Sequence, residues 1–462
     1  MTREQTRSTF FCRDCGAEAL RWEGRCPSCG EWNTLVEAPR PASRGAGSWL
    51  ASAQASEPHE LSEVALEDFP RLPLHMEEAN RVLGGGLVPG SLVLVGGDPG
   101  VGKSTLLLQM AAALAERTGP ALYVSGEESS QQIKLRADRL GLSGKGLHVL
   151  AETDMAAVLH QLDRLSPTLV VVDSIQSVAF SDQPAGAGSI GQVRECGLAL
   201  LRKAKTCGAS IMVTGHVTKD GNLAGPRTLE HMVDAVLYLE GGSLGSYRTL
   251  RSEKNRFGAT DEVGVFEMGD AGLREVPNPS EAALSSRQAN AVGSVVAPVM
   301  EGTRPMLVEI QALATPSALP APRRVANGVD MGRLLMIIAV LVKRAGVNLG
   351  GQDIIVNVAG GFRASEPAVD LGMALALASS LRNTPLPDAF SALGEIGLGG
   401  ELRSSSQVSR RLAELGRMGF ESCIGPRSAF ESVEPPAGVR LLGAGSVGEA
   451  LALALPQRHV GG

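Results

Sequence analysis

A chain of 462 residues is too long to fold around one hydrophobic core, so its length predicts two to four domains. Apolar residues make up 44% of the chain and charged residues 20%, a balance that excludes a disordered protein. The formal net charge of -6 provides no global positive field, so any contact with nucleic acid must be local. The sequence offers neither a membrane span nor the apolar stretch of a signal peptide, and we therefore expect a cytoplasmic protein.

Four cysteines near the N-terminus follow the pattern C-x₂-C…C-x₂-C: Cys12, Cys15, Cys26 and Cys29. This spacing supplies four thiolates on two turns, the usual ligands of a tetrahedral Zn²⁺. Four ligands leave no open position, so we expect the zinc to be structural. A unit spanning residues 1–36 is too small to fold on an apolar core alone, and Trp22 and Trp32 are expected to pack around the metal. A use of these cysteines without metal is the alternative.

Residues 37–60 form the predicted linker, because the stretch from 39 to 57 is rich in Ser, Ala, Gly and Pro. Residues 61–280 follow, and there short apolar runs alternate with helical patterns. The predicted strands are Leu92–Val95, Leu122–Val124, Leu169–Val172 and Ile211–Val213, and the predicted helices are Lys103–Glu116, Gln131–Leu140 and Gln192–Thr206. Alternation of this kind is typical of an α/β domain with a mainly parallel sheet.

A run of Pro, Asn, Pro and Ser at 277–280 ends this pattern. Residues 281–462 then mix strands with helices, which predicts a separate α+β domain. The predicted elements are the strands Met306–Leu313 and Ile354–Val358 and the helices Arg333–Arg344, Val369–Ser380 and Val408–Met418.

A phosphate-binding loop follows the first of these strands and opens a helix. Its residues fit G-x-x-x-x-G-K-[ST] followed by a threonine: Gly97, Asp98, Pro99, Gly100, Val101, Gly102, Lys103, Ser104 and Thr105. Glycines let backbone N–H groups surround the phosphates, Lys103 reaches the β and γ oxygens, and Ser104 is a ligand for Mg²⁺. The sequence thus predicts ATP and Mg²⁺ as cofactors; the alternative is a Gly-rich turn that binds nothing.

Hydrolysis also needs a second acid near the metal and a group that activates water. Asp173 ends an apolar strand, the usual form of a Walker B element, and is the expected acid on the Mg²⁺ side. Glu127 and Glu128 follow another strand, at the edge where open α/β sheets bind ligands. Glu127 is the preferred general base and Glu128 the reserve, while two solvated acids at a helix start are the alternative.

His216 follows the strand that ends at Thr214, where it is either a sensor of the γ-phosphate or a structural histidine. The polar loop after it, residues 217–227, carries Lys219 and Arg227. That loop is either a solvated connection or a contact with nucleic acid.

Taken together, these motifs resemble one family, the bacterial recombination and repair ATPase RadA, also called Sms. The resemblance covers nearly the whole chain. It rests on the cysteine motif with Trp22 and Trp32, on the phosphate-binding loop, and above all on the signature Lys254-Asn255-Arg256-Phe257-Gly258.

The resemblance implies a RecA-like core in a homohexameric ring that translocates on single-stranded and branched DNA and drives branch migration. It also implies contact with the RecA recombinase and association with the nucleoid. In that family, Lys254 and Arg256 couple the nucleotide state to DNA and reach a neighbouring subunit's phosphates, which would stabilise charge that develops during hydrolysis. A solvated turn with two surface cations is the alternative.

The region from about 285 to 455 is similar to the Lon protease domain, whose catalysis needs a serine and a lysine. Ala368 and Leu402 occupy the corresponding positions, so no Ser-Lys dyad can operate. We therefore expect a non-proteolytic scaffold that touches DNA through local clusters such as Arg323–Arg324 or Lys343–Arg344. An ATP-dependent protease and an assembly or signalling ATPase without branch migration are the alternative functions.

Overall fold

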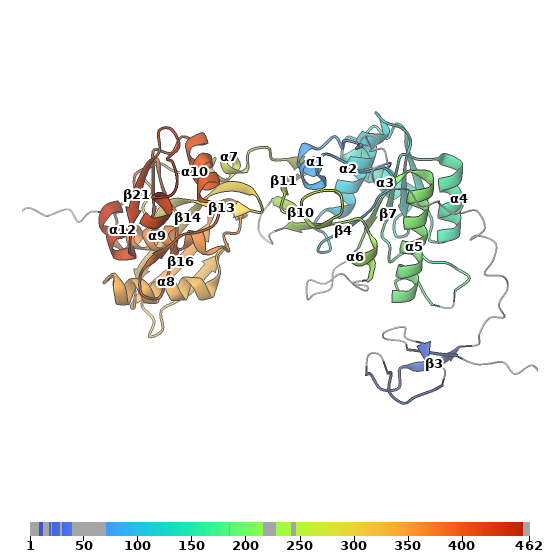
Figure 1. Cartoon of the computed structure of the whole chain (residues 1–462), viewed down its shortest axis with the longest axis horizontal. Coiled ribbons are helices and arrows are strands. Elements are labelled where there is room, and N and C mark those ends of the chain that lie inside the picture. Colours follow the sequence, from blue (N-terminus) through green and yellow to red (C-terminus); the bar gives the residue numbers. More distant parts are fainter. Residues whose placement is uncertain are drawn as a thin grey trace, which may run out of the picture.

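The structure is a computed structural model that describes residues 9–12, 18–19, 21–27, 30–38, 71–183, 185–215, 228–241 and 246–455. His216 and the loop 217–227 lie outside these residues, as do Cys15 and Cys29. Two large sheets, each with its own helices, dominate the molecule (Figure 1). Among the described residues, no helix is long and apolar enough to cross a membrane.

The N-terminal unit is a small antiparallel sheet in the order β2-β1-β3, made of β1 (Thr9–Cys12), β2 (Glu18–Ala19) and β3 (Leu35–Ala38). Its core joins Cys12, Cys26 and Leu35. The expectation that Trp22 and Trp32 pack around this core is wrong, because their exposed fractions are 55% and 68%. Both rings lie against Gly24 instead, where a Cβ would be 3.6 Å from Trp32 and 3.9 Å from Trp22.

The second unit is a nine-stranded sheet in the order β12-β11-β10-β9-β4-β8-β7-β5-β6. Its parallel part consists of β4 (Leu92–Gly96), β5 (Ala121–Ser125), β6 (Leu147–Ala151), β7 (Leu169–Asp173), β8 (Ser210–Thr214) and β9 (Ala235–Gly241). β10 (Tyr247–Asn255), β11 (Val263–Gly269) and β12 (Gly272–Glu275) extend it antiparallel. The four strands predicted in this region are confirmed. The antiparallel extension was not predicted, because β10 is rich in charged residues and lacks an apolar run.

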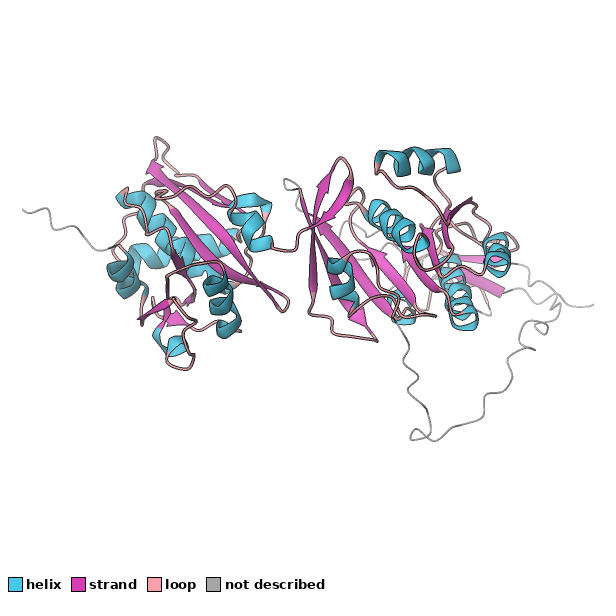
Figure 2. Cartoon of the chain, turned by 90° about the horizontal axis from the view of Figure 1, so that it is seen from above, coloured by secondary structure: helices cyan, strands magenta, loops and turns pink. Residues whose placement is uncertain are grey.

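Helices cover both faces of this sheet (Figure 2). α1 (Glu77–Leu83), α2 (Lys103–Ala115) and α3 (Ser130–Arg139) pack on one face, and α4 (Met155–Leu165), α5 (Ile190–Cys207) and α6 (Thr228–Met232) on the other. Successive residues of β4 alternate between the two cores: Val93 and Val95 face α2, whereas Leu92 and Leu94 face α5. A strand buried on both faces explains the continuous apolar run in the sequence.

The third unit is a seven-stranded sheet in the order β15-β16-β14-β13-β17-β20-β21. Its strands are β13 (Ser294–Glu301), β14 (Arg304–Pro316), β15 (Arg324–Asn327), β16 (Gln352–Val358), β17 (Phe390–Ala392), β20 (Ser422–Pro426) and β21 (Arg440–Ala444), with a separate pair β18 (Glu395–Ile396) and β19 (Leu402–Arg403). Its helices are α7 (Pro279–Leu284), α8 (Met331–Arg344), α9 (Asp370–Arg382), α10 (Val408–Arg417), α11 (Arg427–Phe430) and α12 (Val447–Ala454), with short 3-10 turns η1 (Ala359–Gly361) and η2 (Pro367–Val369). The two strands and three helices predicted here are confirmed.

A buried ion pair ties α10 to β13 in this unit. The fully buried guanidinium of Arg411 donates both terminal nitrogens to the Glu366 carboxylate, each at 2.6 Å, and one of them also to the Pro298 carbonyl at 2.7 Å. The same carboxylate accepts the Met300 amide at 2.8 Å. Both terminal nitrogens of Arg411 thus have acceptors. A buried charge needs such partners, because it has lost its contact with water.

Replacing Glu366 with alanine leaves a buried guanidinium without its carboxylate. We expect Glu366→Ala to destabilise this unit by about 3 to 5 kcal/mol. Hydrogen exchange of the β13 and α10 amides measures the change. The control is Glu401→Ala, whose partner Arg403 is exposed, and which should leave the same exchange rates unchanged. Equal protection in both variants would contradict the role given to the buried pair.

Candidate active site

The loop between β4 and α2 has a backbone that side chains would disturb. Gly97 has φ +144°, and a Cβ there would lie 2.3 Å from the Leu239 carbonyl oxygen of β9. Gly102 has φ +115°, and a Cβ there would lie 2.5 Å from the Met268 side chain. These glycines allow the loop to pack directly against β9 and β11. The loop thereby brings the first amides of α2, which has no acid in its first turn, to the end of β4.

Lys103 begins α2 and is almost entirely buried beside this loop. Its ammonium donates to the Gly97 carbonyl at 2.6 Å and to the Asp98 carbonyl at 3.0 Å. Burial lowers its pKa, and the carboxylates of Asp173, Asp98 and Glu127 oppose that effect. The lysine is therefore the centre of a cluster that joins the phosphate loop with both predicted acids.

Asp173 is fixed at the end of β7 by two neighbouring strands. Its Oδ2 accepts the Tyr123 hydroxyl at 2.5 Å, and its Oδ1 accepts the Thr214 hydroxyl at 2.7 Å. Burial and the Asp173 carboxylate raise the pKa of Tyr123 well above its usual value, so this phenol stays protonated and donates. Sequence reasoning missed Tyr123 and Thr214, because Tyr123 lies in the middle of an apolar strand and no local pattern links either residue to Asp173.

Glu127 and Glu128 lie in the turn after β5 and have different partners. Glu128 forms an ion pair with Arg136 of α3 at 2.6 Å. Glu127 accepts the hydroxyl of Ser174, the residue after Asp173, at 2.8 Å. The geometry therefore directs Glu127 toward the cluster around Lys103, whereas Glu128 is held by a cation of its own subunit.

Lys254 and Arg256 lie at the opposite end of the sheet from their own phosphate loop. The Lys254 ammonium donates to the carbonyls of Glu230, His231 and Val233 at 2.7–3.0 Å, at the end of α6. Burial and Arg256 lower its pKa. Arg256 pairs with Asp234 at 3.1 Å, and Asp234 also accepts the amide of Leu92, the first residue of β4. Since the phosphate loop follows the last residue of β4, the whole strand separates the two groups.

A further arginine reaches the phosphate loop from the same strand that carries Lys254. Arg248, near the start of β10, donates its Nε to the Val101 carbonyl at 3.1 Å. The side chain passes over Gly241, where a Cβ would lie 2.7 Å from it. Sequence reasoning missed Arg248, because nothing in its neighbourhood marks a strand that returns to the loop.

Two of the four predicted zinc ligands belong to the described residues. Cys12 and Cys26 are both buried in the core of the N-terminal unit. Cys26 opens a tight turn, in which its carbonyl accepts the Gly30 amide and its amide donates to the Glu31 carbonyl, both at 2.9 Å. Cys12 and Cys26 would supply two of the four thiolates predicted to bind zinc.

Comparisons with known proteins match all three units. The family described as rubredoxin metal binding domain matches residues 10–37, the AAA domain residues 58–222, and subunit ChlI of Mg-chelatase residues 336–429. The DNA repair protein RadA of Bacillus subtilis is 48% identical over 98% of this chain and 99% of its own length. RadA of Listeria monocytogenes is 47% identical over 99% of this chain and 100% of its own length.

This chain belongs to the RadA family of DNA repair proteins. The predicted fold class is thereby confirmed: an N-terminal zinc ribbon, a P-loop ATPase core and a C-terminal Lon-like domain. In this RadA-family chain Ala368 and Leu402 are both buried, and they pack in two different hydrophobic clusters. The positions that matched a Ser-Lys dyad thus contribute to cores.

Lys103→Ala removes the cation at the centre of the site. We expect ATP hydrolysis to fall by roughly 100-fold or more, because charge developing on the transferred phosphoryl group loses its nearest cation. Steady-state ATPase rates measure the loss. The control is Lys134→Ala on the exposed side of α3, which should hydrolyse ATP normally. Normal turnover by Lys103→Ala would exclude this site.

Cys26→Ser should release the zinc ion, because a hydroxyl is a poor replacement for a thiolate ligand. Elemental analysis of the purified protein gives the metal content per chain. Cys207→Ser is the matched control, since Cys207 is exposed on α5 and far along the chain from the ribbon. Equal zinc content in the two variants would contradict the ligand assignment.

Proposed function

We propose that this chain is a DNA-dependent ATPase and translocase that acts on recombination intermediates and stimulates branch migration during strand exchange. The observation that carries the proposal is the separation of its catalytic parts. The phosphate loop, Asp173 and Glu127 gather at one end of the parallel sheet, whereas Lys254 and Arg256 lie at the other. Such an arrangement suits sites that two subunits complete together.

The roles in one site follow from the donor sets. The amides of the loop Gly97–Thr105 and the Lys103 ammonium would hold the phosphates of ATP, and Ser104 and Asp173 would hold Mg²⁺, which neutralises charge on the β and γ oxygens. Glu127 would orient the attacking water. The bonds from Tyr123 and Thr214 hold the Asp173 carboxylate in place at the end of β7.

Lys254 and Arg256 would act on the nucleotide of a neighbouring subunit. They are separated from their own phosphate loop by the five residues of β4, a strand length of about 16 Å. Head-to-tail contacts repeat around a closed ring. Such a ring would place the end of the sheet that carries Lys254 and Arg256 beside the phosphate loop of the next subunit. We therefore propose a homohexamer in which hydrolysis depends on assembly.

DNA is the proposed track of this ring. The curated relatives are named DNA repair proteins, and this chain covers their full length. Charge on the chain is negative overall, so the contact would come from local cations repeated around the ring. Single-stranded and branched DNA are the proposed substrates, the RecA recombinase is the proposed partner, and the nucleoid in the cytoplasm is the proposed location.

Single-stranded DNA should therefore stimulate ATP hydrolysis by the purified protein, and ATP should accelerate branch migration in a RecA strand-exchange assay. An equal ATPase rate with and without DNA, together with unchanged branch migration, would overturn the proposal. That result would instead favour an assembly or signalling ATPase of the same fold.

Lys254→Ala should lose DNA-stimulated hydrolysis and retain nucleotide binding, because its own phosphate loop lies at the far end of β4. A fluorescent ATP analogue measures binding, and a coupled assay measures hydrolysis with and without DNA. Lys205→Ala on the exposed side of α5 is the control and should behave as the unmodified protein. Full stimulation of Lys254→Ala by DNA would refute its coupling role.

A further inference from the structure

The turn between β13 and β14 of the C-terminal domain touches the ATPase sheet at the segment that carries the family signature. We call residues Glu301–Arg304 the docking turn, and residues 256–262, which connect β10 to β11, the signature loop. Figure 1 shows β13 reaching toward β10 and β11 across the gap between the two sheets. These two turns come from parts of the chain that are about 40 residues apart.

Two hydrogen bonds and one close approach join the turns. The Thr303 amide donates to the Asp261 carbonyl at 2.8 Å, and the Thr303 hydroxyl donates to the Glu262 carboxylate at 2.7 Å. Gly302 has φ +62°, and a Cβ there would lie 1.8 Å from the Asp261 carbonyl oxygen. No side chain fits at that point, so the two backbones touch directly.

Ion pairs fix both ends of the docking turn on the ATPase domain. Arg304 pairs with Glu78 of α1 and donates to the Pro277 carbonyl at 2.6 Å. The buried Glu78 carboxylate also accepts the Val265 amide of β11 at 2.9 Å. At the other end, Glu301 pairs with Arg251 of β10. The turn is thus bound directly to β10, and to β11 through Glu78 of α1.

The opposite end of the signature loop is held within the ATPase domain. Arg71 donates to the Phe257 carbonyl at 2.5 Å and to the Leu83 carbonyl at 2.7 Å. The Asn255 side chain accepts the Phe257 amide at 2.9 Å. Between these bonds and the docking turn, residues 258–260 are exposed. The C-terminal domain therefore holds one of the two fixed ends of the loop that begins with Arg256.

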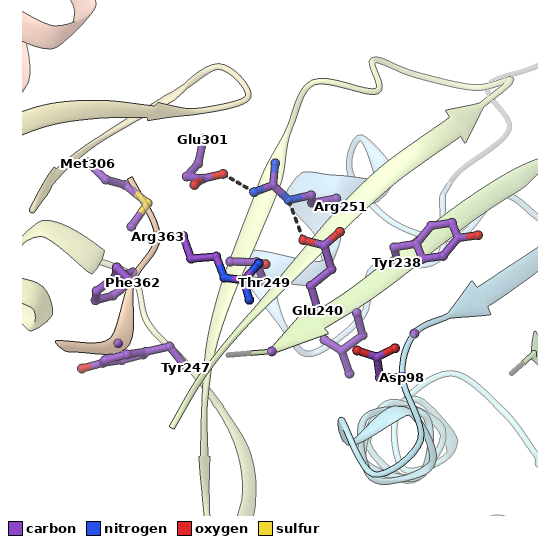
Figure 3. A pocket seen from close by; sticks show the side chains of 14 residues that line it. Asp98, Tyr238, Glu240, Tyr247, Thr249, Arg251, Glu301, Met306, Phe362 and Arg363 are labelled. Atoms are coloured by element: carbon purple, nitrogen blue, oxygen red, sulfur yellow. Dashed lines mark hydrogen bonds and ion pairs between the residues drawn. The ribbon is translucent and has the colours of Figure 1, made fainter. Parts of the chain in front are cut away.

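The same domain also borders the phosphate loop of its own subunit. A pocket of about 340 Å³ lies between the two domains, with Gly97 and Asp98 on one side and Phe362 and Arg363 on the other. In Figure 3, Arg251 crosses this space between Glu240 and Glu301. The rings of Tyr247 and Phe362 stack at 4.6 Å at the start of β10. The C-terminal domain thus contacts β10 at its first residue, through Phe362, and at its middle, through Glu301.

We propose that the docking turn is a positioning element for hydrolysis: it sets the signature loop so that Arg256 and Lys254 meet the neighbouring subunit's nucleotide. This inference rests on the proposed function, because it needs sites shared between subunits. A contact that served only to join two domains would not need to be made to the backbone of the signature loop. Thr303, Gly302 and Arg304 act here through the loop and touch no substrate.

Gly302→Ala tests the turn, because the added methyl group must displace the Asp261 carbonyl. The matched control is Gly346→Ala: its φ of +66° gives the same backbone strain, but a Cβ there meets nothing within 4 Å. We expect the kcat of DNA-stimulated hydrolysis to fall by about tenfold or more in Gly302→Ala, since a displacement of about 1 Å at a reacting group costs that much. The KM for ATP should stay within about twofold, because the subunit's own phosphate loop is unchanged.

Thr303→Val and Thr303→Ser provide a second pair that keeps the backbone of the turn. Valine removes the hydroxyl that binds Glu262, whereas serine retains it, so kcat should fall in the first variant and recover in the second. A purely structural role would lower the melting temperature of Thr303→Val and leave its kcat at 25 °C unchanged.

The outcomes separate this inference from the proposed function. If DNA does not stimulate the unmodified protein, the proposed function fails. If DNA stimulates it and Gly302→Ala matches Gly346→Ala, or Thr303→Val matches Thr303→Ser, the docking turn has no positioning role. A loss of kcat confined to Gly302→Ala and Thr303→Val supports the inference, and where Gly302→Ala fails to fold the threonine pair decides.

Discussion

The close packing of the phosphate loop on β9 is the constraint from which the arrangement of the ATPase domain follows. Gly97 touches the Leu239 carbonyl with no room for a side chain, so β9 must run beside β4 with its end at the loop. β10 then returns antiparallel along β9. The first residues of β10 therefore lie beside the phosphate loop, and its last residues lie at the opposite end of the neighbouring strands.

β10 therefore carries residues for two different places. Arg248 contacts the phosphate loop through the Val101 carbonyl. Lys254 and Arg256 follow it in the chain, and Arg256 lies eight residues further on, at most about 26 Å away along an extended chain. The pairing of β10 with β9 shifts register between Ser252 and Lys254, so the strand is irregular just before Lys254. The C-terminal domain contacts the start of β10 through Phe362 and the middle of β10 through Glu301 of the docking turn.

The parallel core and the phosphate site were predictable from the sequence because each has a local signal. Leu169–Val172 is apolar throughout because β7 is buried on both faces. The glycines of the phosphate loop have a fixed spacing before the lysine that begins α2, and this spacing is a recognisable motif. β10 has no such signal, since its charged residues alternate between partners on other strands and another domain. Tyr123, Thr214 and Arg248 were missed for the same reason: their partners are distant in sequence. For Trp22 and Trp32 the sequence misled in the other direction. Their place beside the cysteine motif suggested packing around the metal, but both side chains are more than half exposed.

The burial of Ala368 and Leu402 is compatible with the proposed positioning role of this Lon-like domain. A catalytic dyad needs a hydroxyl and an amine held in an open site, whereas Ala368 and Leu402 fill separate hydrophobic clusters. The nearby Glu366 meanwhile binds the buried Arg411 and the Met300 amide, one residue before the docking turn. The segment that corresponds to a protease nucleophile thus braces the strand that ends in the turn. Under the proposed role of the docking turn, these bonds to β13 would help to hold the signature loop in place.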